Sequence, residues 1–397
     1  MKLTIIGRFQ FLKKDNKIFA LPAYGYSYWE KYLERFDSLL IIGEPVKSYL
    51  INGSLVELQD NRISVVIVDP IERPKDIFKT KSVRNELEKI IKNSDCIMVK
   101  PSCRRGIISI KLCQKYNIPF FVELTGDVDK TLSERHNLIY FLYGKFLYHR
   151  IKKSIKKCQF GLYVTEQYLQ RRYPISGEMC GCTDAIIPIA GDDVLSKRLE
   201  KIVSLDKNIN IGLIGYYHDK RKGIDLALKA ISILKYKYNI EINLHILGTG
   251  EQVDRDKWYD FSKKISVDDL LYFDKPRIGS LEVAKWIDTM DLIILPSRSE
   301  GFPRAIAESM SRACPTITSN VCGLEEMVDK KWQHKCNDYK ELAQMILEMI
   351  SDKKNMEEAA LFNFNKSKNY SFDYLLKKRN TFFNNFISYC ESHEVKK

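Results

Sequence analysis

Residues 291–308 read DLIILPSRSEGFPRAIAE, and this stretch decides the fold of the second half of the chain. The apolar run 292–295 predicts a strand buried on both faces, as in a parallel sheet covered by helices. A loop follows, and Pro303 fits the first turn of a helix, where no backbone N–H is needed. Ligands of open α/β sheets bind beyond the carboxyl ends of the strands, so we expect this loop and helix to border a ligand site.

The same alternation of apolar runs and amphipathic stretches extends through the rest of the chain. The expected strands are 3–7, 38–43, 63–68, 96–99, 120–124, 161–164, 209–215, 242–247, 270–273, 292–295 and 316–319. The expected helices are 82–92, 105–116, 223–236, 340–350, 355–364 and 371–390. Two successive series of this kind predict an α/β fold with two Rossmann-like, doubly wound parallel sheets.

A chain of 397 residues is long enough for two domains. Pro, Gly and two Asp residues at 188–193 predict a break and a hinge there. We therefore expect an N-terminal domain at 1–190 and a second domain at 191–370. The aromatic, amphipathic segment 371–397 is expected to form a helix that crosses back to the first domain.

Charge and composition narrow the class of protein. Residues 1–190 carry 31 Lys and Arg against 20 Asp and Glu, whereas residues 191–397 carry 33 against 31. The first half is thus the better candidate for meeting an anionic partner. No run of about 18 apolar residues predicts a membrane-spanning helix, and the short apolar N-terminus does not resemble a signal peptide. The ten cysteines include no CxxC pair, which favours reduced thiols in a cytoplasmic protein.

Two carboxylates stand out beside the 292–295 strand. Glu300 lies in the loop and Glu308 about a turn and a half into the helix, with seven residues between them. A helix N-terminus offers free N–H groups to a phosphate, while one carboxylate could accept hydrogen bonds from a sugar and the other from a ribose diol. Alternatively, both glutamates are ordinary solvated residues.

This E-x7-E spacing, within Pro296-Ser-Arg-Ser-Glu300-Gly-Phe-Pro303 and Glu308-Ser-Met-Ser-Arg-Ala-Cys-Pro315, resembles glycosyltransferase family 4. The resemblance implies a retaining enzyme of the GT-B architecture, two domains facing across a cleft. It implies that Glu300 contacts the donor sugar and Glu308 the nucleotide ribose. The other donor-binding residues implied on this loop and helix are Gly301, Phe302, Pro303 and Arg304.

A second element of the resemblance follows the 209–215 strand. Lys222-Gly223 matches a Lys-Gly pair of the family, whereas Tyr216 stands where the family has Arg after the strand's final Gly215. Cations at a strand end suit a diphosphate, and a solvated basic turn is the alternative. The implied donor contacts are Gly215, Lys220, Arg221 and Lys222, together with Gly25, which fits the family's glycine turn in the first domain.

The first domain supplies candidates for the acceptor side. Glu123 and Asp127 close the 120–124 strand, and either could orient the acceptor hydroxyl or draw its proton. Thr125 stands where many relatives have His, so the resemblance implies same-face displacement with proton transfer to the leaving diphosphate. Asp127-Val-Asp129 also spells a metal motif of another glycosyltransferase fold, but two Rossmann-like halves argue against it. We expect no metal and no cofactor beyond the donor substrate.

Residues 144–158 contain six Lys and Arg, no acid, and interleaved aromatic and aliphatic side chains. Such a helix suits an anionic membrane surface, which would agree with a lipid-linked acceptor. The alternative is an ordinary helix with solvated lysines.

Taken together, the sequence predicts a hexosyltransferase that moves a sugar from a nucleoside-diphosphate donor to a glycan or lipid-linked saccharide in bacterial surface polysaccharide synthesis. We expect it in the cytoplasm, with peripheral membrane contact through 144–158 and without nucleic-acid binding. Two alternatives stay open: a non-catalytic basic protein that binds membrane or nucleic acid, and a nucleotide-sugar epimerase.

Overall fold

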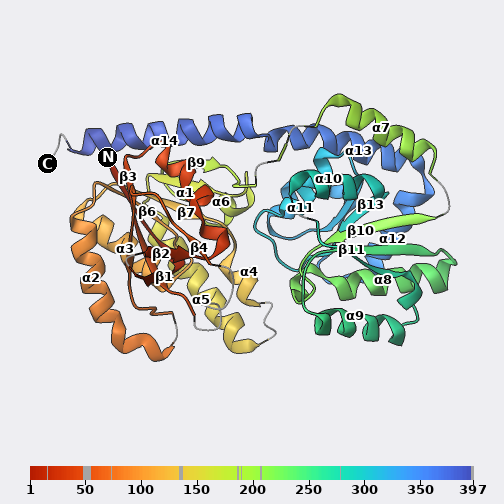
Figure 1. The fold of residues 1–397 in the computed structure, drawn as a ribbon, viewed down its shortest axis with the longest axis horizontal. Coiled ribbons are helices and arrows are strands. Elements are labelled where there is room, and N and C mark those ends of the chain that lie inside the picture. The colour runs from red at the N-terminus through yellow and green to blue at the C-terminus, as the bar shows by residue number, and fades with distance from the viewer. Residues whose placement is uncertain are drawn as a thin grey trace.

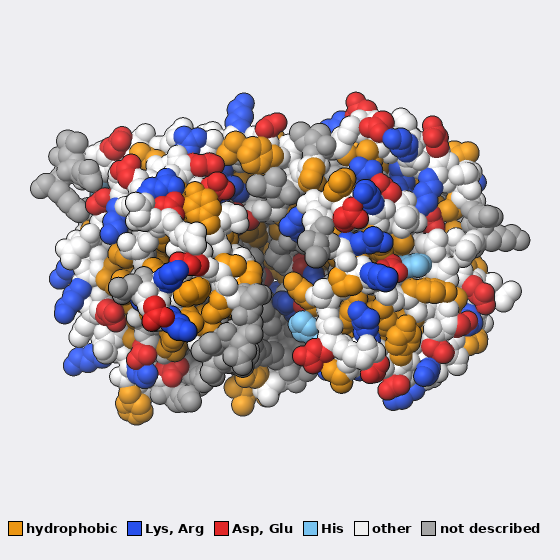
Figure 2. Space-filling view, viewed as in Figure 1, with side chains coloured by type: hydrophobic (Ala, Val, Ile, Leu, Met, Phe, Trp, Pro, Cys, Tyr) orange, Lys and Arg blue, Asp and Glu red, His pale blue; other side chains and the backbone are white. Residues whose placement is uncertain are grey.

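The structure is a computed structural model that describes all residues except 16, 48–54, 73, 134–136, 186, 189, 206–207, 278 and 395–397. It has two halves, each a sheet covered by helices, joined along one side by the long C-terminal helix (Figure 1). None of the helices in the described part of the chain combines the length and apolarity that crossing a bilayer requires. The surface is hollowed along the boundary between the halves (Figure 2).

The first sheet has a parallel core in the order β5-β3-β1-β6-β7-β8-β9. Its strands are β1 (Lys2–Lys14), β3 (Ser38–Pro45), β5 (Ile63–Ile67), β6 (Cys96–Val99), β7 (Phe120–Leu124), β8 (Phe160–Tyr163) and β9 (Glu178–Gly181). Most positions in β6, β7 and β8 are buried, which explains their unbroken apolar sequences.

Strand β1 differs from the expected strand 3–7, because it continues to Lys14 after a register shift between Ile6 and Gln10. Its second half forms an antiparallel hairpin with β2 (Lys17–Ala20), which pairs in turn with β4 (Val56–Glu57). These short strands and β9 were not predicted from the sequence. The helices of this half are α1 (Tyr26–Leu33), α2 (Thr80–Lys92), α3 (Arg104–Tyr116), α4 (Val128–Ser133), α5 (Leu138–Ile155) and α6 (Tyr168–Arg172).

The second sheet is entirely parallel, in the order β12-β11-β10-β13-β14-β15. Its strands are β10 (Ile209–Ile214), β11 (Ile242–Leu247), β12 (Leu271–Asp274), β13 (Leu292–Leu295), β14 (Thr316–Ser319) and β15 (Gln333–His334). Its helices are α7 (Asp192–Val203), α8 (Ile224–Tyr238), α9 (Gln252–Lys264), α10 (Ser280–Thr289), α11 (Arg304–Ser311), α12 (Tyr339–Ser351) and α13 (Lys353–Ser367).

The chain passes between the halves twice, and the two passages lie side by side. Ile187 forms a parallel bridge with Ser371, and the Ile187 N–H donates to the Tyr370 carbonyl at 3.4 Å. The expected hinge 188–193 begins at this bridge, although residue 189 lies outside the described residues. Beyond it, α14 (Phe372–Glu394) runs along the first half (Figure 1).

Aromatic side chains hold α14 against the first sheet. Phe382, Phe383 and Phe386 are buried, and they meet Phe121 and Phe160 at ring distances of 4.9 to 6.0 Å. Edge-to-face contacts of this kind add to the free energy gained by burying the rings. The helix therefore belongs to the core of the first half, although it follows the second half in the sequence.

Candidate functional site

Lys222 is fixed at the carboxyl end of β10 by two glycines. Gly223 has a φ of +72°, and a Cβ there would lie 2.2 Å from the Pro296 carbonyl oxygen, so only glycine lets the turn pack against the end of β13. The aliphatic stem of Lys222 crosses Gly215, where a Cβ would lie 2.7 Å from Lys222 Cγ. The ammonium group is thus directed along the strand ends.

That ammonium group meets the first glutamate of the E-x7-E pair. Lys222 Nζ lies 2.7 Å from Glu300 Oε1, and Ser297 Oγ donates to the same oxygen at 2.7 Å. The Glu300 side chain is 10% exposed, and we find no hydrogen bond to its Oε2 within the described ranges. The ion pair is therefore largely buried and leaves one carboxylate oxygen available to a ligand hydroxyl.

The loop that carries Glu300 is itself anchored. Arg298 makes a two-pronged ion pair with Asp225 on α8, at 3.0 and 2.8 Å. Ser319 on β14 donates to the Ser297 carbonyl. A fork-to-fork guanidinium–carboxylate pair fixes orientation as well as distance, so the position of Glu300 is set by α8 and the sheet.

Glu308 lies on α11, beside a different hollow. Arg304 Nε lies 2.8 Å from Glu308 Oε1, and Arg304 Nη2 donates to Ser280 Oγ at 2.9 Å. Burial raises the pKa of the Glu308 carboxyl above its ordinary value, and Arg304 opposes part of this rise. The carboxylate is therefore poorly solvated, and a diol that donates two hydrogen bonds to it would supply what water does not.

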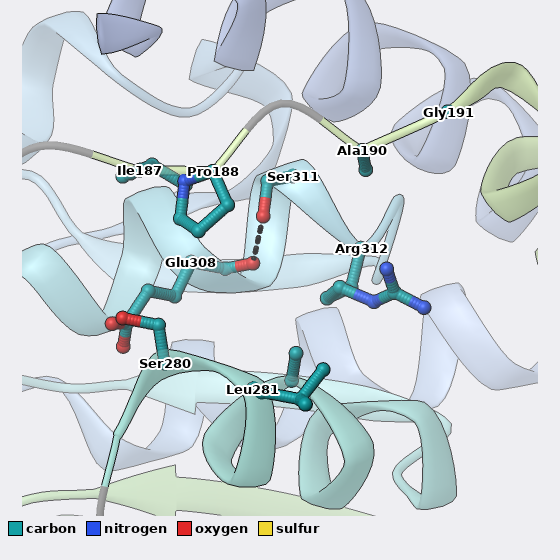
Figure 3. Close-up of a pocket in the computed structure, with 10 residues that line it drawn as sticks. Ile187, Pro188, Ala190, Gly191, Ser280, Leu281, Glu308, Ser311 and Arg312 are labelled. Atoms are coloured by element: carbon teal, nitrogen blue, oxygen red, sulfur yellow. Dashed lines mark hydrogen bonds between the residues drawn. The ribbon is translucent and has the colours of Figure 1, made fainter.

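This hollow has a volume of about 380 Å³ and lies between α10, α11 and the passage between the halves. Figure 3 shows the Glu308 side chain directed toward Ser280, below Pro188. The remaining lining residues include Leu281, Ala284, Ser311, Arg312 and Gly191. Glu308 is among the residues that line this hollow, whereas Glu300 lies beside Lys222 and is not among them.

The other sequence-predicted donor residues lie around this loop. Pro303 precedes α11 as its N-cap, one residue before the expected first turn, and Phe302 packs edge-to-face on Tyr370 with ring centres 5.0 Å apart. Arg221 pairs with Asp219 at 2.7 Å, and Lys220 is exposed. Gly25 caps α1 beside Val56. The structure therefore brings Lys222 and Glu300 together and sets Gly25 in the other half.

The two halves touch at the loop between Glu300 and α11. A Cβ at Gly301 would lie 2.4 Å from the carbonyl oxygen of Thr125, which follows β7. A Cβ at Gly323 would lie 2.0 Å from the Gly301 carbonyl oxygen. Gly301 thus lies between a loop of the first half and a loop of the second, and it has no room for a side chain.

Sequence reasoning missed a second contact between the halves, made by Glu326 at the end of the 3-10 helix Cys322–Glu326. Its carboxylate accepts the backbone N–H groups of Glu166, Gln167 and Tyr168, the last two at 2.8 and 2.9 Å. Glu166 and Gln167 immediately precede α6 and Tyr168 is its first residue, so these N–H groups lie at the helix N-terminus, which attracts an anion. A lone glutamate in an irregular segment carries no sequence signal for such a role.

Asp127 is fully engaged within the first half. Its carboxylate accepts from the hydroxyls of Tyr168 and Tyr173 at 2.8 Å each and from Arg172 Nε at 2.9 Å. Asp129 pairs with Arg172 at 2.8 Å and with Lys145 at 2.9 Å. Both carboxylates of the D-x-D sequence are thus held by the protein's own cations and hydroxyls.

No group of three or more His, Cys, Asp or Glu side chains that could hold a metal ion occurs in the part of the chain that the structure describes.

Glu123 lies on β7 among polar groups from two other elements. Its Oε2 accepts from the Tyr32 hydroxyl at 3.2 Å and lies 3.4 Å from Lys100 Nζ. Lys100 also donates to the Tyr28 hydroxyl at 2.8 Å. Burial, reinforced by the Glu123 charge, raises the pKa of Tyr32 well above its ordinary value, so its hydroxyl remains a donor. The carboxyl edge of the first sheet therefore presents an ion pair rather than a free base.

Comparison with known proteins agrees with this arrangement. Residues 208–352 match the family model described as Glycosyl transferases group 1. The chain is 27% identical over 376 residues to protein CapJ of Staphylococcus aureus, covering 94% of this chain and 92% of CapJ. It is 29% identical over 112 residues to the O-antigen biosynthesis glycosyltransferase WclY of Escherichia coli, covering 28% and 29% of the two chains.

The fold was compared in the same way. The structure of HepE from Anabaena in complex with UDP superposes with a TM-score of 0.64 at 14% identity, covering 98% of this chain and all of HepE. At this identity the likeness concerns the fold, and it confirms the expected arrangement of two Rossmann-like domains.

Proposed function

We propose that this chain, a glycosyltransferase of the GT-B fold whose residues 208–352 form a group 1 domain, is a retaining hexosyltransferase. It moves a sugar from a nucleoside-diphosphate donor to a hydroxyl of a glycan or lipid-linked saccharide in bacterial surface polysaccharide synthesis. The observation that supports this best is the Lys222–Glu300 pair at 2.7 Å, which lies beside the contact between the domains.

In the proposed complex, Lys222 leaves Glu300 to neutralise the donor diphosphate, because a phosphate carries more charge than a carboxylate. Glu300 then accepts hydrogen bonds from hydroxyls of the donor sugar, and Glu308 accepts from the ribose diol. The backbone N–H groups of the loop around Gly301 and at the start of α11 add donors to the phosphate side. HepE was solved with UDP, so a uridine donor is the first to test.

The proposed transfer breaks the bond between the sugar C1 and the diphosphate oxygen and forms a bond from C1 to the acceptor oxygen on the same face. The acceptor proton passes to the departing diphosphate, and nucleoside diphosphate is released. We assign the proton to the leaving group because Asp127 accepts three hydrogen bonds from side chains of the protein. Lys222 stabilises the charge that develops on the diphosphate.

On the acceptor side we propose Glu123 as the residue that orients the nucleophilic hydroxyl. Its partner Lys100 holds the carboxylate in place, and displacement of this weak 3.4 Å contact would free an oxygen for the acceptor. Asp127 is proposed to act indirectly by fixing α6, whose N–H groups bind Glu326 of the other domain. The protein is proposed to work in the cytoplasm, in peripheral contact with an anionic membrane.

A thermal-shift screen with UDP-, GDP- and ADP-sugars tests the donor assignment, because a bound donor stabilises the native state by mass action. One nucleotide sugar should raise the melting temperature of the wild type and of Lys237→Gln, a control on the exposed face of α8. The same donor should fail to stabilise Lys222→Gln. If Lys222→Gln responds like the control, the diphosphate is held elsewhere.

The stereochemistry needs a separate measurement. Proton NMR of the early product should show the anomeric configuration of the donor sugar. An inverted product would exclude the retaining mechanism while leaving the donor site intact.

A further inference from the structure

Helix α5 has an apolar surface that the fold does not use. Its buried side consists of Gly144, Leu147, Ile151 and Ile155, which pack on the first domain. The first half of the helix nevertheless exposes large apolar side chains. The exposed fractions are 70% for Leu138, 74% for Ile139, 58% for Leu142 and 52% for Phe146. Single exposed apolar residues are common, whereas a contiguous row of them marks an interaction surface.

These side chains form one stripe that changes character along the helix. Ile139, Leu142 and Phe146 are spaced by three and four residues, so they lie on the same face. Arg150 and Lys153 continue that face with the same spacing, and both are exposed. The stripe is therefore apolar in its first half and cationic in its second. The helix expected at 144–158 thus begins earlier, at Leu138. Its exposed apolar side chains lie mainly in the N-terminal half, and most of its cations lie in the C-terminal half.

A groove of about 260 Å³ adjoins this stripe, between α3 and α5. Three cationic side chains line it, Arg104, Lys111 and Arg150, and none of its lining residues in the described part of the chain is acidic. Its apolar walls are Ile107, Ile108, Phe146 and Leu147. At the start of α3, the Glu72 carboxylate accepts the backbone N–H of Arg104 at 2.9 Å.

We propose that this surface docks on an anionic phospholipid membrane, with a lipid phosphate in the groove and the side chains at 138–146 in the interface. A lipid phosphate would pair with the three cations of the groove, and the acyl chains would contact the apolar side chains that line it. Nucleic acid would satisfy the cations but not Leu138, Ile139 and Leu142. An interfacial helix combines these same features, an apolar face beside Lys and Arg.

This inference extends the proposed function, because it places the membrane next to the acceptor side of the cleft. Helix α4 connects the end of β7, where Asp127 lies, to the region of α5. Lys145 on α5 pairs with Asp129 on α4 at 2.9 Å. A lipid-linked saccharide in the same membrane would therefore emerge near the acceptor edge of the first sheet.

Vesicle flotation of the full-length chain without donor tests the proposal separately from transfer. The wild type should float with phosphatidylcholine vesicles that contain phosphatidylglycerol and not with phosphatidylcholine alone. Each cation near an anionic surface contributes about a fivefold gain in affinity, so Arg104→Gln/Lys111→Gln/Arg150→Gln should weaken binding on the order of 100-fold. The double variant Ile139→Ser/Leu142→Ser should also fail to float.

Matched control variants remove the same number of cations, or of exposed apolar side chains, at surfaces outside α3 and α5. Lys237→Gln/Lys257→Gln/Lys263→Gln removes three exposed cations from the other domain, and Val203→Ser/Val253→Ser replaces two side chains that are 62% and 65% exposed. Both controls should float like the wild type. If the charge control loses as much binding as the groove variant, or if neither stripe nor groove variant loses binding, the proposal is wrong.

Donor-dependent release of nucleoside diphosphate, measured without vesicles, should be unchanged in the groove and stripe variants. Absence of this release from the wild type, together with intact flotation, would count against the transferase proposal instead. The melting temperature of each variant shows that it is folded.

Discussion

The contact between Gly301 and Thr125 makes a sharp prediction about the closed cleft. A Cβ at Gly301 would lie 2.4 Å from the Thr125 carbonyl oxygen, whereas ordinary contacts begin at 3.4 Å. Gly301→Ala must therefore move the Glu300 loop and the first domain apart by about 1 Å. Misplacement on that scale can lower the rate by about 100-fold even when no reacting group is changed.

The matched control is Gly126→Ala, one residue from the same contact, where no heavy atom lies within 4 Å of an added Cβ. The assay is kcat/KM for release of nucleoside diphosphate, with melting temperature as a check on folding. Gly301→Ala should lose about two orders of magnitude, and Gly126→Ala should stay close to the wild type. Equal activity of Gly301→Ala and the wild type, or an equal loss in both variants, would refute the reasoning.

Three further predictions concern stability and pH. Gly223→Ala should lower the free energy of unfolding by about 2–4 kcal/mol in urea denaturation, since its positive φ adds to a backbone clash. Gly279→Ala, which also has a positive φ but adds no clash because nothing lies within 4 Å of its Cβ, should lose less. Burial raises the pKa of Glu308. This carboxyl therefore favours folding at acidic pH, and its contribution to stability is lost as the pH rises through its folded pKa. Glu308→Gln should keep or raise the melting temperature at pH 7, and it should weaken donor binding measured by calorimetry. Phe386→Ala should lower the free energy of unfolding by about 3–5 kcal/mol, because Phe386 is buried. Phe372, on the same helix, is 47% exposed, so Phe372→Ala should lower it only slightly. Equal losses would show that α14 is not part of the first domain's core.

The central strands could be predicted because each is a short, unbroken apolar run. Strands β6, β7, β11, β13 and β14 have the bounds that the sequence predicts. The continuation of β1 after residue 7 was not predicted, although Arg8-Phe9-Gln10-Phe11 alternates between polar and buried apolar side chains, as a half-buried strand does. Its pairing depends on tertiary contacts between β1, β2 and β4.

Some residues of the site could likewise be predicted from the sequence, and others could not. The E-x7-E spacing and Lys222-Gly223 were visible in the sequence, and the structure places Lys222 against Glu300. The partners of Asp127 come from residues 168–173, some forty residues away, so their number could not be foreseen. The role of Glu326 depends on where α6 begins in the other domain, which no local pattern encodes.

Two buried residues near α11 adopt a backbone conformation that favours glycine. Ala313 and Cys322 both adopt a positive φ, +50° and +51°, and both are buried. Non-glycine residues there cost about 1–2 kcal/mol each. The packing around α11 and the contact loop must therefore compensate for strain that glycine would avoid.

The account depends on Glu300 as the carboxylate that receives the donor sugar. The decisive measurement is the rate of transfer by Glu300→Gln with the donor found in the thermal-shift screen, beside Glu282→Gln on the exposed side of α10 as control. Glu300→Gln should lose on the order of 100-fold or more in rate while it remains folded, and Glu282→Gln should lose nothing. Full turnover by a folded Glu300→Gln variant would contradict the account.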